Sequence, residues 1–250
     1  MRVLLTNDDG IYAKGIEAIY LALVEAHEVT VVAPETEQSA VGHAITFLDP
    51  LRVTPVQRNG RFFGYALNGT PADCVKIAIA ELIDPPPQVV VSGINMGANV
   101  GVNVIYSGTV SAATEAALMG IPAVAVSIDS FNATDFSAAT TFILRLLQVL
   151  EKKSLPPGVS LNVNAPSVPA EQVRGVRITH QGRRKSIESY DRRVDPRDHV
   201  YYWLTNTSIF QDPDSDADSS AVAENYISVT PVHHDLTHYE TLELLKEWDL

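Results

Sequence analysis

The chain has 250 residues, with 18 lysines and arginines against 30 aspartates and glutamates, and its net charge is −12. This acidic balance disfavours the binding of a nucleic-acid polymer along a broad basic surface. No stretch approaches the 18 continuous apolar residues that favour a membrane span, and the single cysteine, Cys74, excludes an intrachain disulfide framework. We therefore expect a soluble, cytoplasmic protein that has neither a nucleic-acid polymer nor a membrane as a partner.

Apolar runs alternate with helical patterns through the first two-thirds of the chain, which is typical of a doubly wound, mostly parallel sheet. Residues 44–68 interrupt this alternation with two β-rich pieces, and Asn59-Gly60 between them favours a hairpin turn. We expect strands at 2–7, 28–33, 88–92, 123–127 and 159–164, and helices at 14–26, 71–83, 109–119 and 135–151.

The character of the sequence changes near residue 165. Arginines and a lysine crowd residues 183–197, which show little helical or strand periodicity, and the acidic segment 212–220 is expected to be an exposed loop. Residues 226–230 alternate like a strand, and residues 239–248 have the pattern of a closing amphipathic helix.

These patterns predict an α/β fold with two parts. Residues 1–165 are expected to form an α/β core with a mostly parallel sheet, which includes the β-rich excursion at 44–68. Residues 166–250 are expected to form a smaller and more irregular part. Its closing strand and helix are expected to pack on the core.

Two adjacent carboxylates follow the first strand. The apolar run Arg2–Thr6 breaks into Asn7-Asp8-Asp9-Gly10, which places Asp8 and Asp9 at the carboxyl end of a buried strand. Two such charges repel each other and are costly to desolvate, so a cation between them would explain their position. Their hard oxygen ligands suit Mg²⁺, Mn²⁺ or Ca²⁺. The alternative is a turn rich in aspartate and asparagine that caps a helix.

A glycine-rich loop follows the strand at 88–92. Gly93, Gly97 and Gly101 stand at four-residue spacing with Asn95 and Asn99 between them, so a ligand can approach the backbone closely. The spacing matches neither a dinucleotide fingerprint nor a phosphate-binding P-loop. Without further context, a flexible turn with asparagines in left-handed conformations is the favoured explanation of this segment.

A third segment combines small and hydroxyl residues at the start of a helix. Ser107 or Thr109 is a plausible cap, and the free N–H groups beside Gly108 could bind an anion. Residues 77–144 contain no lysine or arginine, so a phosphate here would depend on metal, backbone, hydroxyl and amide groups. Ser39 follows the strand at 28–33 and is expected near the same sheet edge. A plain capped helix is the alternative.

Taken together, these segments resemble the SurE family of survival-protein nucleotidases. The resemblance runs from Asn7-Asp8-Asp9-Gly10 through the segment 34–39 and Asn68-Gly69-Thr70-Pro71. It continues through Ser92-Gly93-Ile94-Asn95 and Tyr106-Ser107-Gly108-Thr109 and ends in the strand at 228–231. It therefore spans nearly the whole chain.

The resemblance implies a divalent-metal-dependent phosphomonoesterase that hydrolyses nucleoside monophosphates. It would act as a 5′-nucleotidase, with 3′-nucleotides as a further substrate class. One divalent ion per subunit, Mg²⁺ or Mn²⁺ with Ca²⁺ as a substitute, would be bound by Asp8, Asp9, Ser39 and Asn95. The family's phosphate-binding elements fall on Asn95, Gly97, Asn99, Ser107, Gly108 and Thr109. The resemblance also implies that residues 1–165 form a three-layer, Rossmann-like catalytic core. It further implies a homodimer or homotetramer, with a β-hairpin of residues 166–250 involved in oligomerisation.

Two mechanisms and two other functions stay open at this stage. Asp8 and Asp9 are the expected catalytic residues, and either a metal-oriented water or the Asp8 carboxylate could attack the phosphate. An aspartyl-phosphate phosphatase is disfavoured because its carboxylates are normally separated by one residue and it needs a downstream lysine. A nucleotide-binding module without catalysis would bind nucleotide but release no phosphate.

Overall fold

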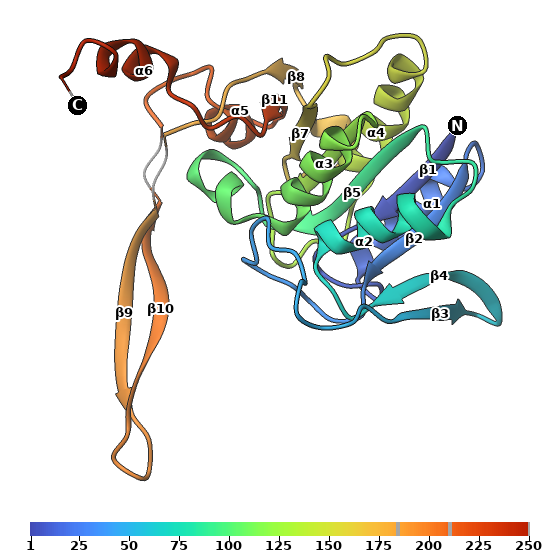
Figure 1. The fold of residues 1–250 in the computed structure, drawn as a ribbon, viewed down its shortest axis with the longest axis horizontal. Helices are drawn as coiled ribbons and strands as arrows, with labels where there is room; N and C mark the ends of the chain where they lie inside the picture. The colour runs from blue at the N-terminus through green and yellow to red at the C-terminus, as the bar shows by residue number, and fades with distance from the viewer. Residues whose placement is uncertain (184–185, 210–211, 250) are drawn as a thin grey trace.

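The computed structural model describes residues 1–183, 186–209 and 212–249. A mixed sheet of nine strands forms its centre, in the order β3-β4-β2-β1-β5-β6-β7-β11-β8 (Figure 1). The pairs from β4 to β7 are all parallel, whereas β3 and β11 run antiparallel to β4 and β7. The strands are β1 (Arg2–Thr6), β2 (Glu28–Pro34), β3 (Val53–Arg58), β4 (Arg61–Leu67), β5 (Val89–Met96), β6 (Ala123–Ile128), β7 (Val159–Ala165), β8 (Gly175–Ile178) and β11 (Tyr226–His233).

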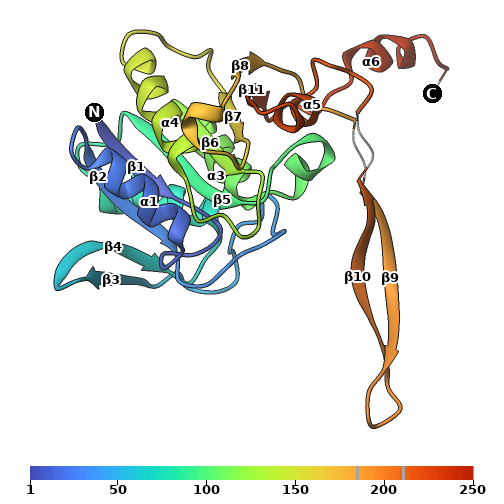
Figure 2. The same cartoon turned by 180° about the vertical axis from the view of Figure 1, so that it is seen from behind.

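Helices cover both faces of this sheet, which confirms the predicted α/β class. Buried side chains of α1 and α4 share one apolar cluster with β1, β5 and β6, and those of α2 and α3 form a second cluster on the opposite face. Figures 1 and 2 show these two layers from opposite sides. The helices are α1 (Lys14–Leu23), α2 (Pro71–Ile77), α3 (Gly108–Leu118), α4 (Ser137–Leu150), α5 (Asp218–Ala223) and α6 (Tyr239–Leu245), with short turns η1 (Ala78–Leu82), η2 (Gly101–Tyr106) and η3 (Ala170–Gln172).

The composition of α3 explains how it comes to lie so close to the sheet. All residues from Gly108 to Ala117 are buried, and alanines at 112, 113, 116 and 117 present little volume to the strands. The helix can therefore approach the carboxyl ends of β1 and β5, where the candidate site lies.

The segment after residue 165 contributes to the same sheet and also leaves it. Strands β8 and β11 extend the sheet beyond β7, whereas β9 (Ser186–Val194) and β10 (Val200–Ile209) form a separate antiparallel hairpin. In both views this hairpin projects away from the rest of the molecule. The β-hairpin expected in the C-terminal part is thereby confirmed, and its role in oligomerisation stays a prediction. The sequence shows little periodicity at 183–197 because a hairpin exposed on both faces needs no alternation of apolar and polar residues. Arg184 and Lys185 lie outside the described residues.

Two local expectations for the C-terminal part differ from the structure. Residues 213–216 are exposed as expected, but Ala217, Asp218 and Ser219 are buried and begin α5. Helix α6 was expected to pack on the core, yet none of its residues is buried. It lies at the far end of the molecule, and Leu244, Leu245 and the following Trp248 are exposed.

Asp218 ties this C-terminal part to the loops at the sheet edge. Its carboxylate accepts hydrogen bonds from the backbone N–H groups of Gly101 (2.9 and 3.1 Å), Gly182 (3.0 Å) and Ser219 (2.7 Å). The side chain of Gln181 adds a bond to the Gly101 carbonyl oxygen at 2.8 Å. The segment that leads into the hairpin is thus bound to the loop that follows β5.

No helix in the described part of the chain is long and apolar enough to cross a membrane. Cys74 is a free, buried cysteine on α2.

Candidate active site

Asp8 is held at the N-terminus of α3. Its Oδ1 accepts a hydrogen bond from the Thr109 hydroxyl at 2.5 Å, and its Oδ2 accepts one from the Thr109 backbone N–H at 3.1 Å. A Cβ atom at Gly108 would lie 2.9 Å from the Asp8 Cβ, so only glycine lets the helix approach this closely. Burial raises the pKa of Asp8, and the hydrogen bonds from Thr109 partly oppose that rise. The positive end of the helix favours a negative charge at this point.

The carboxylate of Asp9 accepts fewer and longer hydrogen bonds than that of Asp8. Its Oδ2 accepts one long hydrogen bond, 3.4 Å, from the Met96 backbone N–H at the end of β5. Burial, followed by the charge of Asp8, raises the pKa of Asp9 to about 6. The two carboxylates therefore repel each other in the folded protein, as the sequence led us to expect.

Ser39 and Glu37 come to this edge from the segment after β2. The backbone N–H of Gln38 donates to the carbonyl oxygen of Asp8 at 2.8 Å, which holds the segment against the end of β1. Ser39 is exposed, and its hydroxyl donates to Glu37 Oε1 at 2.5 Å. The charge of Glu37 contributes to the raised pKa values of both aspartates, so this third carboxylate is near enough to act on the pair electrostatically.

The loop after β5 carries two predicted site residues, Asn95 and Asn99, which differ in burial. Asn95 is half-buried and donates from its amide nitrogen to the Gly97 carbonyl oxygen at 2.6 Å, so its amide oxygen is the atom that could bind a cation. Asn99 is buried beneath the loop, where its amide donates to the Ser127 hydroxyl at 2.9 Å. Its backbone N–H donates to Asn164 Oδ1 at 2.8 Å. The Asn99 side chain thus supports the loop from its buried side, whereas Asn95 directly precedes Met96, whose backbone N–H donates to Asp9.

Ser107 begins α3 next to Asp8. Its hydroxyl oxygen accepts a hydrogen bond from the Val110 backbone N–H at 3.1 Å, and the residue is the N-cap of the helix. Ser107, Gly108 and Thr109 therefore lie together at the positive end of α3, as predicted. In this structure the donors of Thr109 are directed at Asp8.

This arrangement fits a divalent cation. Two repelling carboxylates, a hydroxyl and an amide oxygen supply only hard oxygen donors, which Mg²⁺ and Mn²⁺ prefer. Within the described residues no group of three or more His, Cys, Asp and Glu side chains is placed to hold a metal ion. Ser39 and Asn95 are the further oxygen-bearing side chains that the sequence predicted beside the aspartates.

A sequence profile described as "Survival protein SurE" matches residues 3–188, which is most of the chain. The chain belongs to the SurE family. The predicted family is thereby confirmed.

Several relatives match this chain over nearly its whole length. The 5′-nucleotidase SurE of Syntrophobacter fumaroxidans is 71% identical over 250 residues, covering 100% of both chains. The 5′-nucleotidase SurE of Syntrophus aciditrophicus is 50% identical over 98% of this chain and 93% of its own. The crystal structure of the SurE protein from Aquifex aeolicus superposes with a TM-score of 0.86 at 35% identity, covering 98% of each chain. The predicted hydrolase class agrees with the names of these relatives.

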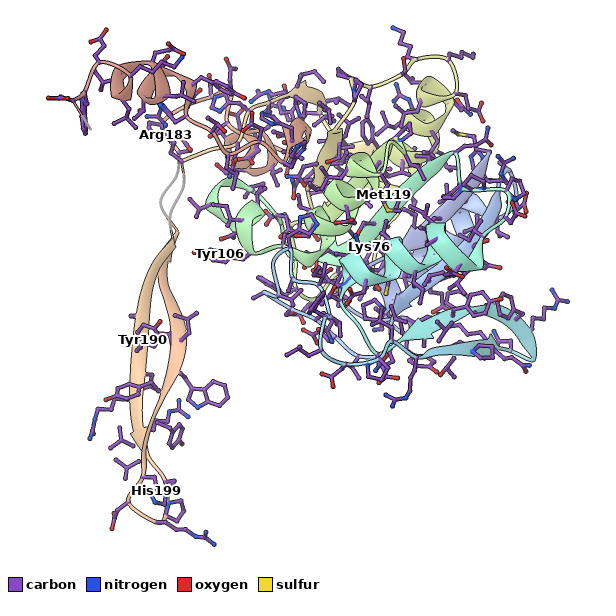
Figure 3. All side chains as sticks on the ribbon, viewed as in Figure 1. Lys76, Tyr106, Met119, Arg183, Tyr190 and His199 are labelled. Carbon is purple, nitrogen blue, oxygen red and sulfur yellow. The ribbon has the colours of Figure 1, made fainter. Side chains whose placement is uncertain are left out.

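Two acidic side chains on the segments that form the site, Glu37 and Glu115, were not expected from the sequence. Glu37 was passed over in favour of Ser39, although an acidic residue two positions earlier was a visible signal. Glu115 on α3 is buried and pairs with Lys76 Nζ at 3.0 Å and with His43 Nε2 at 2.9 Å. Figure 3 labels Lys76 on α2. These partners are 39 and 72 residues away in the chain, so no local pattern could reveal them.

Proposed function

We propose that this protein is a divalent-metal-dependent phosphomonoesterase that hydrolyses nucleoside monophosphates to nucleoside and phosphate. The observation that carries the proposal is the pair Asp8 and Asp9 at the end of β1. Burial raises the pKa values of both aspartates, and the pair lies against the N-terminus of α3. The hydrogen bonds from Thr109 to Asp8 do not explain a second carboxylate beside it, whereas a cation between the two would offset their repulsion.

One Mg²⁺ or Mn²⁺ ion per subunit would be bound by Asp8, Asp9, Ser39 and Asn95, with Ca²⁺ as a substitute. When bound, such an ion polarises a phosphoryl oxygen and lowers the pKa of a coordinated water. The charge of the ion would also offset the repulsion that raises the pKa of Asp9.

The residues of the chain supply binding and orientation. Asp8 is fixed by two hydrogen bonds from Thr109, which supports a role as an oriented ligand and general base rather than a covalent nucleophile. In the proposed reaction, a water oxygen attacks phosphorus while the ester P–O bond breaks. The nucleoside oxygen leaves and takes up a proton. The start of α3 at 107–109 and the backbone from Asn95 to Asn99 would stabilise the phosphate oxygens.

We also propose which nucleotides the protein hydrolyses, where it is located and how its subunits assemble. The names of the relatives support 5′-nucleotides as the main substrates, and 3′-nucleotides are proposed as a second class. The single, buried cysteine supports a cytoplasmic location. The protein would work as a homodimer or homotetramer.

A phosphate-release assay over a panel of 5′- and 3′-nucleoside monophosphates tests the function. The metal is first removed by chelation and then restored singly as Mg²⁺, Mn²⁺ or Ca²⁺. We expect no turnover after chelation and recovery with Mn²⁺ or Mg²⁺. Full activity at negligible metal content would contradict the metal requirement, and tight nucleotide binding without phosphate release would indicate a binding module.

A further inference from the structure

An exposed phenylalanine lies beside the candidate phosphate loop and has no role in the site described so far. Phe131 belongs to the loop 129–136 between β6 and α4, at the edge of the sheet where β5 also ends. Ile128, the last residue of β6, pairs with Met96 at the end of β5. The side chain of Phe131 is 80% exposed, so most of its ring faces solvent.

The ring lies directly against the loop that carries Asn95. A Cβ atom placed on Gly97 would come within 2.6 Å of Phe131 Cε1 and 3.0 Å of its Cζ. Gly97 has a φ of +107°, a conformation that side-chain-bearing residues rarely adopt, and it accepts the hydrogen bond from the Asn95 amide. The aromatic ring, the glycine backbone and the candidate metal ligand therefore form one continuous series of contacts.

Packing in the hydrophobic core does not explain why a phenylalanine stands at position 131. Phe63 shows what a structural phenylalanine looks like here, since it is 6% exposed and makes an edge-to-face contact with Tyr20 at 4.9 Å between ring centroids. Phe131 leaves most of its apolar area in water and so contributes little to the free energy of folding. A flat apolar ring beside a phosphate site is suited to stack on a nucleobase, whose π-face is the apolar end of a nucleotide.

We propose that Phe131 forms one wall of a nucleobase subsite and stacks on the base of the nucleoside monophosphate whose phosphate binds at Asp8, Asp9 and Asn95. This inference rests on the proposed function and adds a residue that determines substrate selectivity. Stacking tolerates every base, because all of them present a π-face, so the enzyme accepts all bases and favours purines for their larger area.

The test compares AMP with ribose 5-phosphate, which has the same phosphate ester but no base. For Phe131→Ala we expect KM for AMP to rise about 10-fold, within the range measured when one stacking partner of a base is removed, with kcat nearly unchanged. Both constants for ribose 5-phosphate should stay the same. Phe131→Trp should retain the wild-type KM for AMP. Phe47→Ala is the matched control, because Phe47 is 88% exposed on a different loop.

A binding measurement separates this inference from the proposed function. Adenosine, which carries no phosphate, is titrated into the metal-stripped wild type and the Phe131→Ala variant and followed by NMR. A loss of adenosine affinity in the variant supports the subsite even if the wild type releases no phosphate, in which case only the proposed function fails. Equal losses on AMP and ribose 5-phosphate, or no change in AMP kinetics and adenosine binding, would overturn the inference. A change in subunit assembly without a change in AMP selectivity would instead assign the ring to an interface.

Discussion

The two adjacent aspartates have different surroundings, and this difference sets what each can do. Asp8 has both carboxylate oxygens bound by Thr109, whereas Asp9 has one long contact to a backbone N–H group. In the protein without metal, Asp8 is therefore part of a helix cap as well as of the candidate site. The two readings of Asp-Asp-Gly that the sequence left open, a cap and a cation site, are compatible, because one residue can serve both.

The Asp9→Asn variant tests whether Asp9 binds a metal ion or only stabilises the fold. Turnover should fall about 10²-fold or more, because a metal ligand is lost. The melting temperature of the metal-stripped protein should rise at pH 7. The pKa of Asp9 is about 6 in the folded protein and near 3.8 when unfolded, so its ionisation destabilises the fold as the pH rises through this window. The gain in melting temperature should therefore disappear near pH 4.

Calorimetry of the metal-stripped Asp9→Asn protein at both pH values checks this, with the exposed Asp49→Asn as the matched control. Normal turnover together with a lower melting temperature at pH 7 would make Asp9 a structural residue.

Thr109 is expected to act through Asp8. Thr109→Val keeps the shape of the side chain but removes the hydroxyl that donates to Asp8 Oδ1, so a buried carboxylate oxygen loses its partner. Such a loss costs about 1–3 kcal/mol, which lowers the melting temperature of a chain of this size by several degrees. Turnover should fall about 10-fold as Asp8 loses its fixed orientation. Thr109→Ser should restore both properties, and an unaffected Thr109→Val would show that the hydroxyl bond is unimportant.

The sequence identified Asp8 and Asp9 as a carboxylate pair but could not show which residues form hydrogen bonds with them. Asp8 and Asp9 follow a recognisable strand, and Thr109 follows a recognisable helix start. Their contact spans 101 residues of chain and depends on the order of strands in the sheet. The orientation of Asn99 was equally hidden, because its bonds to Ser127 and Asn164 need β6 and β7 to be in place.

Among the elements, the packing of α1 on β5 positions the candidate ligand Asn95. A Cβ atom at Gly15 would lie 1.8 Å from the Ile94 carbonyl oxygen, so α1 touches the backbone of β5 one residue before Asn95. The contact is possible only for glycine, and it fixes the end of the strand that carries the amide.

Gly15→Ala should therefore destabilise the protein, although the same change within a helix usually stabilises it. Overpacking against backbone costs about 1–3 kcal/mol, so the melting temperature should fall by several degrees, and turnover should fall as Asn95 shifts. Leu21→Ala, on the exposed side of the same helix, is the control and should change little. A stabilised Gly15→Ala protein with normal turnover would contradict the close contact.

The elements themselves followed from the sequence where one face of each is buried. The strands of the parallel sheet and helices α1 to α4 lie close to their expected ranges, because burial imposes a clear apolar pattern. The hairpin β9–β10 lacks such a pattern, since Tyr201, Tyr202, Trp203 and Leu204 are consecutive and all exposed. The division of the chain at residue 165 stays a prediction.

At the scale of the whole molecule, the projecting hairpin pairs with no other strand in the described part of the chain. An isolated two-stranded hairpin is at best marginally stable in water, and this one exposes Tyr190, Tyr202, Trp203 and Leu204 on an arm that Figure 3 shows clear of the body. The arm is therefore suited to pack these apolar side chains against a second copy of the chain.

We expect a light-scattering mass of at least two 27.2 kDa chains at micromolar concentration. Replacing Tyr202 and Leu204 together by glutamate should shift the mass to one chain, because two charges would be buried where apolar side chains meet the partner. Leu118→Glu is the matched control, since Leu118 is similarly exposed on the body at the end of α3. The double variant should keep the circular dichroism of the core, whose sheet does not include the hairpin. A wild-type mass of one chain, or an unchanged mass in the double variant, would show that the arm does not hold the subunits together.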